Sequence, residues 1–213
     1  MPLHKNVPFI ANTPDDLHCL QAAFMTILKY FRPNIEMDWE EWSTITGFER
    51  GKGTWPIAGM VWFKQQGFEV KHTELFDFEQ FSQDPTSYMM QQYSEELAAY
   101  AVAHTNIPAE QHRAKELLEY KDVLENRNPT LEDIKTYLDQ GFLISLNVNA
   151  RALNGKSGFA GHIVTIFDYD NESVTMHDPG SPPMLNRKVK FEDLNIAWKD
   201  PETGHGELTA VKG

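Results

Sequence analysis

Residues 161–180 have the sequence GHIVTIFDYDNESVTMHDPG. Two runs in which apolar and polar residues alternate lie on either side of Asp170, Asn171 and Glu172. This pattern predicts two antiparallel strands joined by a tight turn. The hairpin is the clearest local signal in the chain, and it places the second half of the sequence in a mostly antiparallel sheet.

Further strands are predicted wherever the same alternation returns. They cover 68–75, 142–150 and 206–212. Helices dominate the first half: apolar periodicity predicts a helix over 19–31 that stops before Pro33, because proline cannot continue it. Shorter helices are expected over 37–47 and 53–67, which end at Gly47 and Gly67. Another is expected over 128–141, where Thr130 and Asp133 resemble a capping box and Gly141 ends the helix.

Residues 76–126 form long amphipathic segments with turns at Asp84-Pro85 and Ile107-Pro108. We interpret them as an all-helical insertion. Because helices come first and strands last, the fold class predicted is α+β. In this fold, N-terminal helices pack on a C-terminal, mostly antiparallel sheet, and 1–213 form a single domain.

Composition limits the classes of function. The chain has 213 residues, 41% of them hydrophobic, and needs no metal or disulfide for stability. Its net charge of −12 argues against a nucleic-acid partner, which would require a basic face. Neither a signal peptide nor a membrane span is visible, so we expect a cytoplasmic protein without a membrane partner. No oligomeric state follows from these features.

Three residues of the hairpin and the first helix carry the chemistry that the sequence suggests. His162 begins one strand of the hairpin and Asp178 ends the other. The turn therefore brings the two residues close to facing positions on neighbouring strands. Side chains paired in this way have Cβ atoms about 5 Å apart, within reach of an imidazole–carboxylate hydrogen bond. Cys19, the only cysteine, begins the first helix, where the helix dipole favours a thiolate. A small buried cysteine and a buried structural histidine are the alternative interpretations.

Several stretches of the chain together resemble the peptidases that cleave double-glycine leader peptides from bacteriocins, and more closely their stand-alone relatives in the papain-like cysteine peptidase superfamily. They are VPFIANTPDDLHCLQAAFMTILKYF (7–31), GKGTWPIAGMVWFKQQGFEV (51–70), PTLEDIKTYLDQGFLISLNVNARALNG (129–155) and the hairpin 161–180. The helical segment 76–126 lies outside the resemblance. The fold implied is papain-like.

The resemblance also implies a role for each residue. Cys19 would be the nucleophile, His162 the general base and then acid, and Asp178 the group that orients the imidazole. Asn12 occupies the place where the family has a glutamine that donates an amide hydrogen bond to the oxyanion. Gln21 is a second candidate for this donor. The expected function is therefore a cysteine peptidase or amidohydrolase acting on a peptide or amide substrate through an acyl-enzyme, without a cofactor.

Two other classes of function fit the sequence less well. A metal site at His162, His177 and Asp178 is disfavoured, because residues 177 and 178 of a strand point to opposite faces. A nucleotide site is disfavoured because the glycines of 51–53 lack a phosphate-binding loop pattern. Two alternatives stay open: a catalytically degenerate binding protein that uses 76–126 as its partner surface, and an acyltransferase with the same triad.

Overall fold

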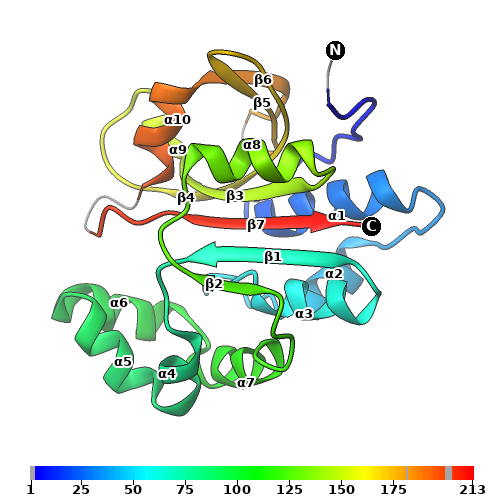
Figure 1. The fold of residues 1–213 in the computed structure, drawn as a ribbon. Helices are drawn as coiled ribbons and strands as arrows, with labels where there is room; N and C mark the ends of the chain where they lie inside the picture. Colours follow the sequence, from blue (N-terminus) through cyan, green and yellow to red (C-terminus); the bar gives the residue numbers. More distant parts are fainter. Residues whose placement is uncertain (1–2, 181, 200–202) are drawn as a thin grey trace.

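The computed structural model describes residues 3–180, 182–199 and 203–213. Within them, a seven-stranded sheet in the order β2-β1-β7-β3-β4-β5-β6 runs through the molecule (Figure 1). The strands are β1 (Glu69–Glu74), β2 (Leu124–Asn126), β3 (Leu143–Asn149), β4 (Gly161–Tyr169), β5 (Ser173–Asp178), β6 (Met184–Lys190) and β7 (Glu207–Lys212). The α+β class predicted from the sequence is confirmed, whereas the single-domain organisation stays a prediction.

Ten helices surround the sheet within the described residues. They are α1 (Cys19–Phe31), α2 (Trp39–Thr46), α3 (Ile57–Gln65), α4 (Phe78–Gln83), α5 (Pro85–Gln92), α6 (Glu95–His104), α7 (Ile107–Leu117), α8 (Leu131–Asp139), α9 (Ala150–Leu153) and α10 (Phe191–Trp198). In Figure 1, α4 to α7 lie below the sheet, beyond its β1–β2 edge, and α8 crosses in front of it.

Strand β7, the last in the chain, lies in the middle of the sheet. It pairs antiparallel with β1 on one side and with β3 on the other. The β3–β4, β4–β5 and β5–β6 pairs are also antiparallel, and only β1 and β2 run parallel. The sheet is therefore mostly antiparallel, as predicted, and β7 joins its two halves.

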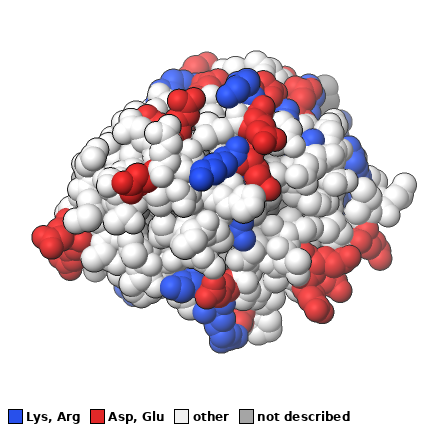
Figure 2. Space-filling model, turned by 90° about the horizontal axis from the view of Figure 1, so that it is seen from below, with Lys and Arg blue, Asp and Glu red and all other residues white. Residues whose placement is uncertain are grey.

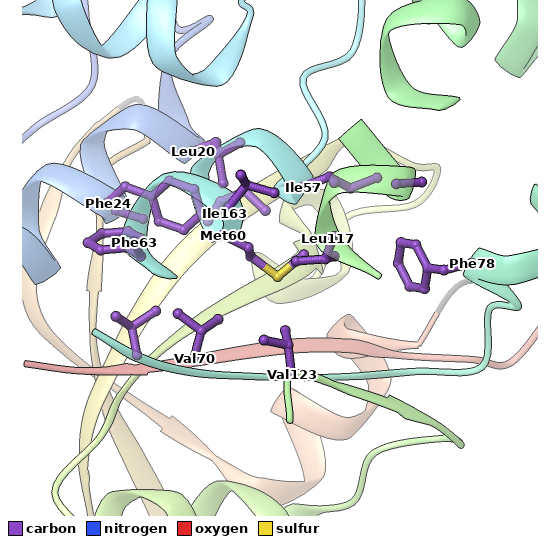
Figure 3. Close-up of a cluster of buried hydrophobic side chains, with 14 of the residues drawn as sticks. Leu20, Phe24, Ile57, Met60, Phe63, Val70, Phe78, Leu117, Val123 and Ile163 are labelled. Carbon is purple, nitrogen blue, oxygen red and sulfur yellow. The ribbon is translucent and has the colours of Figure 1, made fainter. Parts of the chain in front are cut away.

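Each face of the sheet buries its own hydrophobic cluster. One cluster combines α1 and α3 with residues such as Val70, Ile163 and Val211 (Figure 3). Gly59 of α3 lies so close to α1 that a Cβ there would meet Phe24 at 2.1 Å, so glycine is what permits this contact. The other cluster packs α8 and α10 against the opposite face. Helix α1 is thereby fixed against the sheet.

Local sequence signals explain several boundaries. Helix α1 covers the predicted residues 19–31. Helix α2 begins at a capping box of Asp38 and Glu41 and ends at Gly47, which adopts the left-handed conformation. The predicted capping pair Thr130 and Asp133 begins α8.

Other predictions were wrong in detail. The segment 76–126 is not all helical, because 124–126 form β2 at the sheet edge. Within it, Ser94 separates α5 from α6, and its side chain caps α6. The third helix begins only at Ile57, after Pro56. Strand β6 and helices α9 and α10 were not predicted at all.

The surface has no continuous basic area on the face of α4 to α7. Figure 2 shows this face, where lysine and arginine are scattered among aspartate and glutamate. Across the described ranges, every helix is too short or too polar to cross a membrane.

Candidate active site

Cys19 lies at the first residue of α1 and is partly exposed. The side chain of the preceding residue, His18, does not cap the helix, and the first turn contains no acidic residue. The positive end of the helix dipole is therefore not neutralised from within the helix. Helix α1 packs against β4, the strand that carries His162.

The loop before Cys19 is organised by Asn12. Its Oδ1 accepts hydrogen bonds from the backbone N–H groups of Thr13, at 2.8 Å, and His18, at 2.9 Å. Its Nδ2 donates one hydrogen bond to Oδ1 of Asp16 at 2.8 Å, and its backbone N–H donates to the carbonyl of Pro179. Asn12 thus ties the loop before the cysteine to the residue that follows Asp178. One of the two protons on Nδ2 remains for another acceptor.

His162 and Asp178 form a buried hydrogen-bonded pair. Nε2 of His162 lies 2.7 Å from Oδ1 of Asp178, and both residues are less than 9% exposed. The sheet register pairs Thr165 with His177, so the two residues are diagonal neighbours rather than directly opposite.

The remaining nitrogen of His162, Nδ1, is free of Asp178 and available to Cys19. Burial lowers the pKa of His162, but hydrogen bonds to Asp178 and Cys19, together with their charges, raise it to about 10. An imidazole with this pKa keeps its proton at neutral pH.

Asp178 is held at both carboxylate oxygens. Oδ1 accepts from His162 and from the backbone N–H of Gly180 at 3.0 Å, and Oδ2 accepts from Nη1 of Arg187 at 2.7 Å. Burial alone would raise the pKa of Asp178, but the hydrogen bond and charge of His162, then Gly180 and Arg187, lower it. A Cβ at position 180 would lie 3.1 Å from both Asp178 and His162, so glycine is what lets the chain pass this closely.

Arg187 is the site residue that sequence reasoning missed. It lies on β6, and its Nη2 donates to the carbonyl of Leu153 at 2.7 Å and to Oδ1 of Asn154 at 3.1 Å. The guanidinium thereby joins Asp178 to the end of α9. The only sequence signal for this strand is a weak alternation over 184–190, directly after the hairpin. The sheet register pairs Arg187 with Met176.

Gln21, the second candidate for the oxyanion donor, does not face the site. It is fully buried between α1 and α2, where its Nε2 donates to Oγ1 of Thr46 at 2.8 Å. The physical reason is its position in the first turn of α1, on the side of the helix that packs against α2. Of the two candidates, only Asn12 belongs to the loop that precedes Cys19.

His177 engages different partners from its neighbour Asp178. Its Nε2 lies 3.0 Å from the carbonyl of Val7, and the backbone N–H of Asn186 donates to its Nδ1 at 3.3 Å. It thus ties the N-terminal segment to β5. The described residues hold no group of three His, Cys, Asp or Glu that could bind a metal ion.

A hollow of about 280 Å³ opens beside the pair. Its lining includes Asp16, Lys156, His162 and Asp178. The hydrogen-bonded imidazole and carboxylate therefore border an open space.

No family model and no curated protein matches the sequence. Two solved structures are similar in fold over nearly the whole of both chains. One is a double glycine motif protease from an AMS/PCAT transporter in complex with the leader peptide, with 13% identity, coverage of 99% of this chain and 96% of that chain, and a TM-score of 0.49. The other, from Bacillus anthracis, is described as C39-like, with 19% identity, coverage of 98% and 96%, and a TM-score of 0.47.

Proposed function

We propose that the protein is a cysteine peptidase or amidohydrolase that cleaves a peptide or amide bond through Cys19, His162 and Asp178. The observation that carries the proposal is the contact between the imidazole and two groups at once. Asp178 holds Nε2 at 2.7 Å, while the thiol of Cys19 interacts with the same ring. A structural histidine would need neither a sulfur partner nor a carboxylate that is itself held by three donors.

In the proposed reaction, the thiolate of Cys19 attacks the carbonyl carbon of the substrate. His162, already protonated, transfers its Nδ1 proton to the leaving amine, and the C–N bond breaks to give a thioester. The neutral imidazole then removes a proton from water, which attacks the thioester and releases the acid. Asp178 stays ionised throughout and holds the imidazole in the required orientation.

The oxyanion would be stabilised by two N–H donors. One is the backbone N–H of Cys19 at the start of α1, and the other is the second proton on Nδ2 of Asn12. The side chain of Asn12 is well fixed for this role, because its Oδ1 accepts hydrogen bonds from two backbone N–H groups. Donors fixed before the reaction need no reorganisation as charge develops on the oxygen.

Alkylation tests the thiolate directly, since Cys19 is the only cysteine and the label reports no other site. We expect iodoacetamide at pH 6 to modify the native chain faster than the same chain unfolded in urea, because only the folded thiol has an imidazolium partner. His162→Ala should remove this difference. Slower labelling of the native chain would identify a structural cysteine and contradict the proposal.

Turnover is tested with a defined library of peptides, in which new termini are found by mass spectrometry. The native chain should cleave peptides that Cys19→Ala leaves intact, while thermal unfolding of the variant stays close to that of the native chain. Addition of glycinamide distinguishes the acyltransferase alternative, because capture of the thioester by an amine gives a ligated product in place of the acid. Reactive Cys19 without any turnover would favour the binding-protein alternative.

A further inference from the structure

A second hollow lies where β1 ends and β7 begins, next to α4 and α5. It has a volume of about 230 Å³, and its polar lining includes His72, Glu74, Asn147 and Glu207. We call it the acidic hollow. Ile163, the residue after His162, forms part of its wall, so this hollow begins one residue along β4 from the candidate catalytic histidine.

Two glutamates face each other in the acidic hollow. Glu74 of β1 and Glu207 of β7 are directly opposite in the sheet register, which places their Cβ atoms about 5 Å apart. Like charges at such a pair of positions destabilise a sheet. Their pairing is therefore unfavourable for the fold itself and needs another explanation.

No lysine or arginine neutralises the two carboxylates within the described ranges. Nε2 of His72 lies 3.3 Å from Oε2 of Glu74, and Glu207 accepts from Nδ2 of Asn147 at 3.3 Å. Lys199 and His205 line a neighbouring hollow without an ion pair to either glutamate. Residues outside the described ranges contribute no lysine or arginine, since these positions hold Met1, Pro2, Ser181, Asp200, Pro201 and Glu202.

Electrostatics agree with the geometry. Burial raises the pKa of Glu207 and the charge of Glu74 raises it further, whereas His72 and Asn147 lower it, which leaves it at about 7. A cation that entered the hollow would relieve this repulsion and return the carboxylate to its ionised form.

The remaining walls indicate which cation fits. Trp55, Phe76 and Phe78 present aromatic rings, and Met89 and Ile163 add apolar surface. Figure 3 shows Phe78 and Ile163 within the same hydrophobic cluster as Leu20, the neighbour of Cys19. A metal ion would require a polar shell of oxygen ligands, whereas aromatic walls suit an organic cation on a methylene stem.

We propose that the acidic hollow binds the positively charged side chain of a lysine or arginine in the substrate, close to the bond that is cleaved. The proposal rests on the peptidase function, because it assigns the hollow to the same substrate. It deepens that function by naming a basic peptide as the preferred class. The negative net charge of the chain favours the same class.

Binding can be measured without turnover on the full-length Cys19→Ala chain. The probes are Nα-acetyl-arginine methylamide and its uncharged isostere Nα-acetyl-citrulline methylamide, followed by NMR chemical-shift titration. We expect the arginine probe to bind about tenfold more tightly, as one hydrogen-bonded charge pair provides. Glu207→Gln should reduce its affinity to that of the citrulline probe.

Glu69→Gln is the matched control, because it removes the same charge from the other end of β1, where Glu69 pairs with Lys212 at the surface. This variant should keep the preference for arginine. Equal affinity of the two probes, an unchanged preference in Glu207→Gln, or displacement of the arginine probe by millimolar Mg²⁺ at constant ionic strength would overturn the proposal. Circular dichroism verifies that each variant is folded.

Turnover gives a second, separable readout. With peptides that differ only in arginine or citrulline near the cleaved bond, the ratio of kcat/KM should favour arginine about tenfold and fall towards one in Glu207→Gln. Turnover without this preference would overturn the acidic hollow and leave the peptidase standing. A tightly bound arginine probe without any turnover would overturn the peptidase function and leave the acidic hollow standing as a binding site.

Discussion

Asp178 and Glu207 are two carboxylates at strand ends of one sheet, and their surroundings shift their pKa values in opposite directions. Asp178 accepts from His162, Gly180 and Arg187, which lowers its pKa in spite of burial. Glu207 accepts from Asn147 and faces Glu74, and its pKa rises to about 7. Burial acts alike on both groups. The difference lies in the donors, which hold one charge permanently and leave the other for an incoming cation.

Removal of the negative charge of Asp178 should have the largest effect. Asp178→Asn keeps the shape of the side chain but cannot stabilise an imidazolium, so we expect kcat/KM to fall about 10³–10⁴-fold. The pKa of His162, measured by NMR, should fall from about 10 towards its ordinary value of 6.5. In the native chain, the stability that His162 contributes is complete below pH 6.5 and is lost as pH rises to about 10. If the variant kept the kcat/KM of the native chain, Asp178 would have no role in the reaction, and the contrast with Glu207 would have no meaning for function.

Asn12→Asp comes next, because it separates the two functions of the side chain. The aspartate keeps Oδ1 as acceptor for Thr13 and His18 but lacks the Nδ2 donor. We expect kcat to fall about 10²–10³-fold, the effect of losing one oxyanion donor. The double variant with Asp16→Asn removes the repulsion between positions 12 and 16 and should recover stability but not kcat. Recovery of kcat as well would show that Asn12 acts only through the loop.

Arg187 acts as a positioning residue, and its loss should cost less. Arg187→Met frees Oδ2 of Asp178, and we expect activity to fall about 10–100-fold, as for other residues that hold a functional group in place. The high-pH limb of the kcat/KM profile should move to lower pH, since a carboxylate that turns away no longer stabilises the imidazolium. Arg187→Lys should recover part of the activity, because a lysine reaches Asp178 but cannot also bridge to Leu153. A loss of stability with an unchanged pH profile would assign Arg187 to the fold alone.

Removal of one charge from the pair Glu74 and Glu207 should have the smallest effect. It should change the free energy of unfolding and not the rate of the reaction. The pKa of Glu207 lies above its ordinary value of 4.5, so the folded chain holds this proton longer and unfolding free energy falls as pH rises from 4.5 to about 7. A glutamine does not titrate, so Glu207→Gln should not show this fall in unfolding free energy. Thermal unfolding should therefore shift upward at pH 8 and little at pH 5, by about 2–4 °C for each kcal/mol. A downward shift at pH 8 would mean that the charge already has a partner.

The contact between His162 and Asp178 could be predicted because its signals are local. The hairpin 161–180 closes on itself, so periodicity and a turn bring His162 near Asp178 without knowledge of the rest of the fold. Cys19 belongs to a strongly apolar helix with a proline after its end. The link between Cys19 and the hairpin depended on the family resemblance, since no local pattern relates α1 to β4.

What could not be predicted depends on distant pairing. Strand β6 is an edge strand with mostly exposed polar residues, so its alternation is too weak to reveal Arg187. Glu74 and Glu207 lie far apart in sequence and meet only because β7 inserts beside β1. For the same reason, the three residues of β2 gave no signal inside a helical segment.

The central place of β7 has a consequence for biosynthesis. Strands β1 and β3 precede residues 207–212 in the chain, and β7 lies between them in the sheet. Until β7 has been synthesised, β1 with β2 and β3 with β4 to β6 are two sheet fragments without a shared hydrogen-bonded neighbour. The continuous seven-stranded sheet can therefore form only after translation has passed residues 207–212.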